Sequence, residues 1–343
     1  MNIGKWVFSI SAELLGLVPF VWTRRLYRGP TIFPFYHAVS DKSLPHIEYL
    51  YPIRSIAEFE KDLDFLQQHY EPIRLGKEWD SFQLRKGKKQ RMLLSFDDGL
   101  RECHQHIAPI LEHRNIQAVF FVNSGFIDNE DLFYRYKLSI IWGKLKDFSK
   151  YDMAVSQIMK KLEINKAKEI PKRLMSLQHE ESELIDELAS LLNISFADYL
   201  ENEQPYLTTE QLKDLKKRGF LIGAHSEDHP LYYKLSEQEI LRQTKVSCET
   251  IKAFFLGEKI LFSFPFTDYG VGSKLIRKMK QERLFDFCFG CAGLRKEKES
   301  YHIQRIPMES GHHKARAILS LQIIKFAILN WMGRARIQRE KWN

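Results

Sequence analysis

Short apolar runs alternate with amphipathic segments along most of the chain. The runs have the length and apolar content of buried strands and cover residues 31–39, 92–96, 118–123, 220–224, 260–265, 285–289 and 302–307. Between them, apolar residues recur every three or four positions, the spacing of one helix face, in residues 55–70, 103–113, 208–218, 236–256 and 273–283. Repeated strand–helix units with short connections predict parallel strands covered by helices, in a barrel or a doubly wound sheet.

One long stretch, residues 126–205, interrupts this alternation. It shows no strand pattern, is rich in Leu, Ile, Lys and Glu, and holds 11 basic and 15 acidic residues. Stretches of this length without strands are uncommon inside a compact domain unless they have a function of their own. We interpret it as a helical insertion, a lid or a partner surface, within one barrel domain that spans residues 31–311.

The net charge of +8 is confined to the two ends of the chain. Residues 1–30, expected to be a helical segment, carry +3, and residues 312–343, expected to form an amphipathic helix, carry +6. Subtraction leaves −1 for residues 31–311, so a basic groove through the body is not indicated and we expect no nucleic-acid partner. The 343 residues, 44% of them hydrophobic, also exclude a disordered chain.

Both basic ends are also apolar. Residues 6–23 contain one charged side chain, Glu13, and residues 317–333 contain one, Lys325. A charge in the middle of each run argues against a membrane-spanning helix, whereas basic residues beside apolar turns suit helices that lie on an anionic membrane surface. The alternative is that both helices pack on the body of the protein. The first run lacks a small-residue cleavage site, so we expect a retained segment and a cytoplasmic or membrane-peripheral protein.

A pair of carboxylates follows the strand at residues 92–96. Asp97 and Asp98 stand directly before Gly99, which lets the chain turn. In parallel α/β proteins the carboxyl ends of the strands form the active site, and at such an end both carboxylates can reach one pocket. The structural alternative is a turn in which the two carboxylates cap the next helix.

A pair of histidines follows the strand at residues 220–224. His225 and His229 lie four residues apart in a predicted turn, from which two imidazoles can converge on one metal ion. Taken alone, such a pair also fits a structural or surface role. Carboxylates and histidines at the ends of different parallel strands together supply three ligands and leave a coordination position open, as a catalytic metal requires.

These motifs resemble those of a known family. The sequence SFDDG at residues 95–99, followed by HSEDH at residues 225–229, is similar to the first two motifs of the polysaccharide deacetylases with NodB homology, carbohydrate esterase family 4. The strand that contains Tyr36 and His37, the AVFFVN strand and the run TTEQLKDLKKRGFLIGAH also resemble that family. The resemblance spans about residues 31–125 and 206–309.

The resemblance implies a distorted (β/α) barrel and a set of site residues. Asp98, His225 and His229 would bind a divalent metal, with Zn²⁺ as the first choice and Co²⁺, Mn²⁺ or Fe²⁺ as alternatives. Asp97 would be the general base that activates water for attack on an acetyl group. The implied substrate is an acetylated carbohydrate.

Two later motifs depart from the family pattern. Where the family has Arg-x-Pro-Tyr, this chain has Ser263 to Phe266, so the Arg that orients the base is missing, while the backbone N–H of Phe266 would still contact the oxyanion. The family's acid, in Leu-x-His, aligns with Arg305, which retains its proton at neutral pH. We expect His302 to serve as the acid, with the adjacent pair at positions 312 and 313 as alternatives.

The leading hypothesis is a metal-dependent deacetylase acting on N-acetylated sugars of a cell-surface glycan or its precursor. An O-acetyl esterase of the same family is one alternative. The two departures leave open a metal-containing glycan-binding or assembly module without turnover. A non-haem iron oxygenase uses the same ligand set, but the repeated strand–helix pattern does not resemble the antiparallel barrels of that chemistry.

Overall fold

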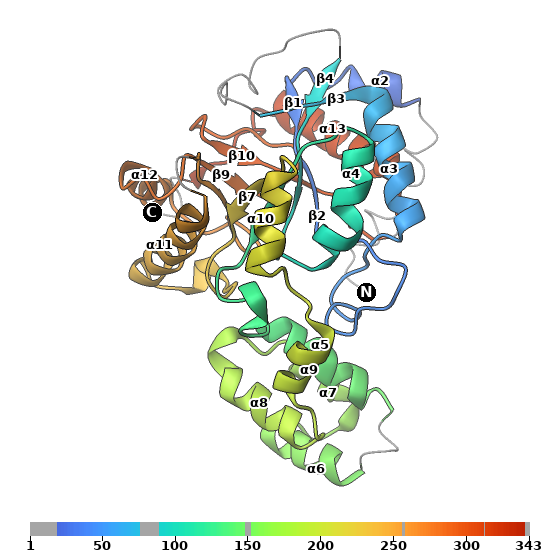
Figure 1. Ribbon diagram of the computed structural model, residues 1–343, viewed down its shortest axis with the longest axis vertical. Coiled ribbons are helices and arrows are strands. Elements are labelled where there is room, and N and C mark those ends of the chain that lie inside the picture. Colours follow the sequence, from blue (N-terminus) through green and yellow to red (C-terminus); the bar gives the residue numbers. More distant parts are fainter. Residues whose placement is uncertain (1–18, 76–88, 148–151, 256–257, 312, 340–343) are drawn as a thin grey trace.

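The computed structural model describes residues 19–75, 89–147, 152–255, 258–311 and 313–339. Most of these residues form a parallel barrel with helices around it, and a lobe of helices extends from one end (Figure 1). The expectation of a helical segment at residues 1–30 falls largely outside the described residues. No described helix is long and apolar enough to cross a membrane.

The barrel is one sheet of parallel strands in the order β10-β9-β8-β7-β6-β5-β2-β11. The two edge strands are consecutive in the chain and are separated only by Arg305. Its backbone N–H donates to the Gly290 carbonyl at 3.0 Å, and the next N–H donates to the Phe33 carbonyl at 2.8 Å. The sheet therefore closes at Arg305, which confirms a barrel and excludes the open doubly wound sheet. The strands are β2 (Pro34–Tyr36), β5 (Leu94–Phe96), β6 (Ala118–Val122), β7 (Leu221–Ala224), β8 (Leu261–Ser263), β9 (Phe287–Gly290), β10 (His302–Gln304) and β11 (Ile306–Pro307).

Two apolar runs expected to be single strands are each divided between two sheets. Residues 31–39 contribute β1 (Thr31–Ile32) as well as β2, and the chain before β5 contributes β4 (Gln90–Met92). These strands pair with β3 (Tyr70–Pro72) in a small parallel sheet of order β1-β4-β3. The helix expected at residues 55–70 therefore ends one residue early, because Tyr70 begins a strand.

Helices cover the outside of the barrel where the amphipathic segments predict them. Ser55, Thr208 and Ser236 each accept a backbone hydrogen bond as N-caps, which satisfies a donor that the first helical turn leaves unpaired. A π-helical turn at Cys103–Ile107 precedes the fourth helix. The helices are α2 (Phe20–Arg24), α3 (Ile56–His69), α4 (Ala108–His113), α10 (Thr209–Lys217), α11 (Glu237–Phe254), α12 (Ser273–Gln281) and α13 (Ala315–Trp331).

The stretch between β6 and β7 forms the helical lobe at the lower end of Figure 1. It has an apolar core of its own, in which Leu138, Ile158 and Leu188 are fully buried. That core continues into the barrel through Tyr206 and Ala38, so the lobe packs on the loops at the carboxyl ends of the strands. Its helices are α5 (Tyr134–Leu145), α6 (Asp152–Lys161), α7 (Ile170–Leu174), α8 (Ser182–Ser190) and α9 (Phe196–Glu203).

Candidate active site

The two motifs meet in one cavity at the carboxyl end of the barrel. Asp97 and Asp98 follow β5, and His225 and His229 follow β7, with β6 between the two strands. All four side chains are buried and line a cavity of about 240 Å³. The parallel sheet brings them together because its strands all end at this edge.

Three of these side chains aim ligand atoms at one point. Nε2 of His225 lies 3.5 Å and Nε2 of His229 lies 3.3 Å from Oδ1 of Asp98, and the two Nε2 atoms are 3.2 Å apart. A tetrahedral Zn²⁺ with bonds of about 2.0–2.1 Å would hold its ligand atoms roughly 3.3 Å apart. The spacing of the three atoms therefore fits a divalent metal.

The hydrogen bonds around the three side chains also fit a bound cation. His225 donates from Nδ1 to the Ser263 carbonyl at 2.8 Å, which leaves the lone pair of Nε2 facing the cluster. Tyr136 donates to Oδ2 of Asp98 at 2.8 Å, whereas the buried Oδ1 receives no hydrogen bond from any described residue. Burial holds the pKa of His229 below its ordinary value despite the adjacent carboxylate, so its imidazole is neutral, the form that binds metals.

The backbone around the cluster adopts conformations that L-residues rarely take. The φ angles are 70° at Asp98, 66° at Ser226, 60° at His229 and 54° at Phe266, all in the left-handed region. Gly99, with φ of 63°, continues the turn after the carboxylates, as the sequence predicts. Each such non-glycine residue costs about 1–3 kcal/mol, and this strain is typical of functional sites that the surrounding fold holds in place.

Asp97 is held by an arginine that the sequence motifs do not predict. Arg305 donates two hydrogen bonds of 2.7 Å, one to each carboxylate oxygen of Asp97. The same guanidinium donates to the hydroxyls of Ser95 at 3.0 Å and Ser263 at 2.6 Å, and only 1% of the Arg305 residue surface is exposed. Burial alone would raise the pKa of Asp97, but Arg305 holds it below its ordinary value, so the group is a carboxylate at neutral pH.

The two departures from the family pattern therefore compensate each other. The position where an arginine is expected is Ser263, at the end of β8, and the guanidinium that contacts Asp97 comes from Arg305, after β10. A small hydroxyl at residue 263 leaves room for this side chain. The sequence carries a signal of the exchange, since an arginine is absent from one motif and present in another, but pairing the two requires the barrel.

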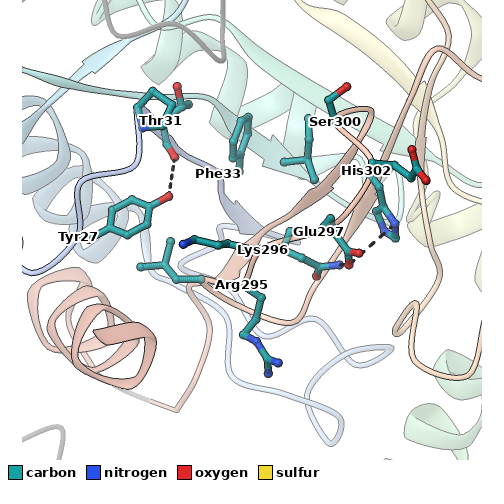
Figure 2. A pocket seen from close by; sticks show the side chains of 13 residues that line it. Tyr27, Thr31, Phe33, Arg295, Lys296, Glu297, Ser300 and His302 are labelled. Carbon is teal, nitrogen blue, oxygen red and sulfur yellow. Dashed lines mark hydrogen bonds and ion pairs between the residues drawn. The ribbon is translucent and has the colours of Figure 1, made fainter. Parts of the chain in front are cut away.

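His302, expected to be the acid, does not line this cavity. It begins β10, so it lies toward the amino end of the strand, whereas Arg305 follows its carboxyl end. Its Nε2 lies 2.9 Å from Oδ2 of Asp268, and Figure 2 shows it beside Glu297 in a different cavity of about 390 Å³. Arg339 forms ion pairs with both of these acids. The structure therefore places His302 in a buried charge network and does not support it as the acid.

His37 is the additional histidine at the catalytic cavity that the motif comparison missed as a site residue. Of the two further alternatives, residue 312 lies outside the described residues and His313 does not line the cavity. His37 follows β2, and its Nδ1 lies 2.5 Å from Oε2 of Glu309. Burial by itself would lower the pKa of His37, but the Glu309 carboxylate raises it to about 9. Its place at a strand end, like that of both motifs, was the signal that could have identified it.

The helical insertion supplies part of the cavity wall. Phe133 and Arg135, at the start of α5, line the cavity. The Phe133 ring lies 4.6 Å from the His229 ring, and the Arg135 guanidinium lies 5.1 Å from the centre of the Phe266 ring. Phe266, expected to contact the oxyanion through its backbone, lies on the same wall with its ring 4.5 Å from His229. The insertion is therefore close enough to influence which substrates enter.

The solved structures most similar to this chain that we consider are deacetylases. The Streptococcus pyogenes deacetylase PplD, in complex with acetate, has a TM-score of 0.53 at 13% identity, over 84% of this chain and 97% of that chain. IcaB from Ammonifex degensii has a TM-score of 0.50 at 16% identity, over 86% and 97%. The de-N-acetylase from Aggregatibacter actinomycetemcomitans has a TM-score of 0.51 at 14% identity, over 84% and 99%. At these identities the likeness establishes the shared fold.

The comparison with family models extends this likeness to the sequence. A search of curated proteins finds no match. The model described as polysaccharide deacetylase matches residues 84–282, which include both motifs and the whole insertion. This match covers more than half of the chain, and the structure places the motifs that it contains at one cavity. The chain therefore belongs to the polysaccharide deacetylase family.

Proposed function

We propose that this protein removes acetyl groups from N-acetylated sugars of a polysaccharide or a glycan precursor, with a divalent metal held by Asp98, His225 and His229. Membership of the family makes it a hydrolase that acts on amide bonds of an acetylated carbohydrate. The observation that carries the finer proposal is the convergence of three ligand atoms beside Asp97, a carboxylate oriented by Arg305.

The ligand set of one carboxylate and two imidazoles favours zinc, with Co²⁺, Mn²⁺ or Fe²⁺ as alternatives. When bound, the metal would act as a Lewis acid that polarises the acetyl carbonyl and increases the acidity of the attacking water. The protein contributes the orientation of the three ligands. Tyr136 fixes Asp98, and the Ser263 carbonyl fixes the tautomer of His225.

Asp97 and His37 are suited to opposite proton transfers. Asp97 is ionised, so one of its oxygens can accept a proton from water as the water oxygen attacks the acetyl carbon. His37 is protonated at neutral pH and can donate its proton to the sugar nitrogen as the carbon–nitrogen bond breaks. The products are acetate and a free amine. A backbone N–H at Phe266 would stabilise the oxyanion.

The proposed function predicts metal-dependent stability and acetate release. Metal at 100 times its Kd should stabilise the fold by about 2.7 kcal/mol, seen as a rise in Tm. Metal-loaded protein should also release acetate from N-acetylglucosamine oligosaccharides. His229→Ala should lose both effects, because it removes one of three ligands. His104→Ala, which changes a histidine paired with Asp214 away from the cavity, should keep both.

The substrate arm of this experiment separates the alternatives. Acetate release from O-acetylated xylan but from no N-acetylated sugar would favour the O-acetyl esterase. Metal binding with no acetate from any acetylated sugar would overturn the deacetylase and favour a glycan-binding module. The main support for that module was the absence of a base-orienting Arg and of an acid, and Arg305 and His37 now stand at the cavity.

His37→Gln should lower kcat about a hundredfold, near the lower end of the range for general acid–base catalysis. The glutamine retains a polar group but cannot donate an ionisable proton. His104→Gln is the matched control, because that histidine also pairs with a carboxylate and lies outside the cavity. Metal content should be unchanged in both variants. Equal kcat for the two variants would exclude His37 as the acid.

The pH profile tests the same assignment through Glu309. The active form requires protonated His37, so activity should be present below and lost above a pKa of about 9. Glu309→Gln should move this alkaline limit to lower pH, because the carboxylate that raises the pKa is removed. Other titratable or charged groups that face His37 across the cavity are Tyr51, Asp97, Asp98 and Arg305. An unmoved limit in Glu309→Gln would assign it to another group.

A further inference from the structure

Exposed apolar side chains gather on the two helices at the ends of the described chain. Among the described residues, large hydrophobic side chains are exposed at nine positions, and six of these belong to α2 and α13 or directly follow them. Trp22 is 64% exposed and Trp331 is 87% exposed, fractions that are unusual for tryptophan in a folded protein. The other four are Val21, Leu26, Ile328 and Met332.

These side chains belong to one continuous surface, because α2 packs against α13. The Tyr27 and Phe326 rings meet at 5.0 Å, and Leu26 and Asn330 line the same cavity of about 480 Å³. Asn330 directly precedes Trp331, so the apolar end of α13 lies beside the chain that leaves α2. We call this surface, formed by α2, α13 and the residues that immediately follow each helix, the terminal surface.

The terminal surface carries positive charge and no negative charge. Residues 19–30 and 313–339 contain no Asp or Glu, whereas the helical insertion holds 15 acidic and 11 basic residues. Exposed basic side chains stand beside the exposed apolar ones; they are Arg25, Arg28, Lys325, Arg334 and Arg336. A protein partner would more often present both signs of charge to such a surface, whereas an anionic lipid surface presents only one.

We propose that the terminal surface binds peripherally to an anionic phospholipid membrane. Tryptophan is favoured at the boundary between headgroups and acyl chains, where its ring is buried and its N–H remains hydrated. The basic residues would contact the lipid phosphates. The sequence that leads into α2 adds Trp6, Val7, Phe8 and further apolar residues at the same place. This proposal is independent of the metal and of the deacetylation chemistry.

The proposal also orients the molecule on the membrane. In Figure 1, α2 lies near the upper end of the longest axis and α6, in the helical insertion, lies near the lower end. A membrane at the terminal surface would leave the insertion pointing into solution. Met153, on α6 and 83% exposed, therefore provides an apolar position far from the proposed contact.

Sedimentation of the full chain with lipid vesicles tests the proposal. The protein should bind vesicles of phosphatidylcholine and phosphatidylglycerol, bind phosphatidylcholine alone much more weakly, and lose affinity as salt is added. Trp22→Glu combined with Trp331→Glu should lower the affinity at least tenfold. Met153→Glu is the matched control and should bind like the unmodified protein. Unchanged Tm and monomeric state in each variant would show that the fold is retained.

A second variant tests the electrostatic contribution separately. Changing Arg25, Arg28 and Arg334 to Gln should lower the affinity about fivefold per residue, or about a hundredfold together. Equal binding to neutral and anionic vesicles would overturn the proposal. So would full binding by the double Trp variant, which would assign the contact to the first 18 residues alone. A dimer in solution that the Trp331→Glu change dissociates, with no vesicle binding, would make the terminal surface an interface between two copies.

Discussion

Replacing Asp97 with asparagine is expected to lower kcat for deacetylation by up to about 10⁴-fold, the upper end of the range for general acid–base catalysis. Asparagine has nearly the same shape, but its amide is not a base and cannot accept the proton of the attacking water. Asp98, His225 and His229 are unchanged, so metal content should remain that of the unmodified protein. Acetate release and metal analysis on the same sample are the required measurements.

The Asp97→Asn result needs a control for the change from carboxylate to amide. Asp64→Asn makes the same change on α3, where the side chain is 65% exposed and pairs with Arg114. Its kcat should equal that of the unmodified protein. If Asp97→Asn lost its metal together with its activity, Asp97 would be a ligand and the assignment of the two carboxylates would be reversed. Undiminished kcat with full metal content would exclude Asp97 as the base.

Replacing Arg305 with methionine is expected to destabilise the protein by about 3–5 kcal/mol, because the change leaves the buried Asp97 carboxylate without its partner. Methionine retains much of the length of the side chain but none of its donors. The pKa of Asp97 should rise, and kcat should fall because the carboxylate loses the guanidinium that orients it. Urea denaturation measures the free energy of unfolding, and kinetics on the folded fraction measure kcat.

A buried arginine elsewhere separates the two effects of Arg305. Arg54 is also buried and pairs with Asp62, with Nε 3.1 Å from Oδ2. Arg54→Met should lower stability by a similar amount while the folded fraction retains its kcat. Arg305→Lys should recover part of the stability but less of kcat, because an ammonium group cannot form both hydrogen bonds in the fixed plane of a guanidinium. Equal kcat for Arg305→Met and Arg54→Met would leave Arg305 with a structural role only.

The double variant of Arg305 and Asp97 provides a further check. The two side chains share a pair of hydrogen bonds, so their separate effects on unfolding free energy should not add. Once Asp97 is an amide, loss of Arg305 no longer strands a buried negative charge. We therefore expect the double variant to be more stable than the sum of the single changes predicts. Simple additivity would contradict the buried ion pair.

The barrel strands and both sequence motifs could be predicted because their signals are local. Each apolar run of a few residues is long enough to identify a buried strand, and Asp97, Asp98, His225 and His229 directly follow such runs. The rule that parallel strands end at one edge then brings the four side chains together. The division of two runs between two sheets was not predictable, since pairing with β3 depends on distant chain.

The choice between His302 and Arg305 shows where the sequence by itself was insufficient. Three residues separate them, but β10 places the first toward its amino end and the second at its carboxyl end, where the barrel closes. The contact between Arg305 and Asp97 joins residues 208 positions apart. The contact of His37 with Glu309 joins residues 272 positions apart. No periodicity or spacing within one segment encodes such pairs.

The sequence by itself therefore determined the class of fold, the family resemblance and the four motif residues of the cavity. The tertiary structure alone decided which arginine orients Asp97, which histidine stands ready as an acid, and that the apolar ends of the chain share one surface. The physical reason is the same in each case. Strand and helix signals depend on neighbours in the chain, whereas proton transfer, ion pairing and surface composition depend on neighbours in space, which barrel closure and helix packing determine.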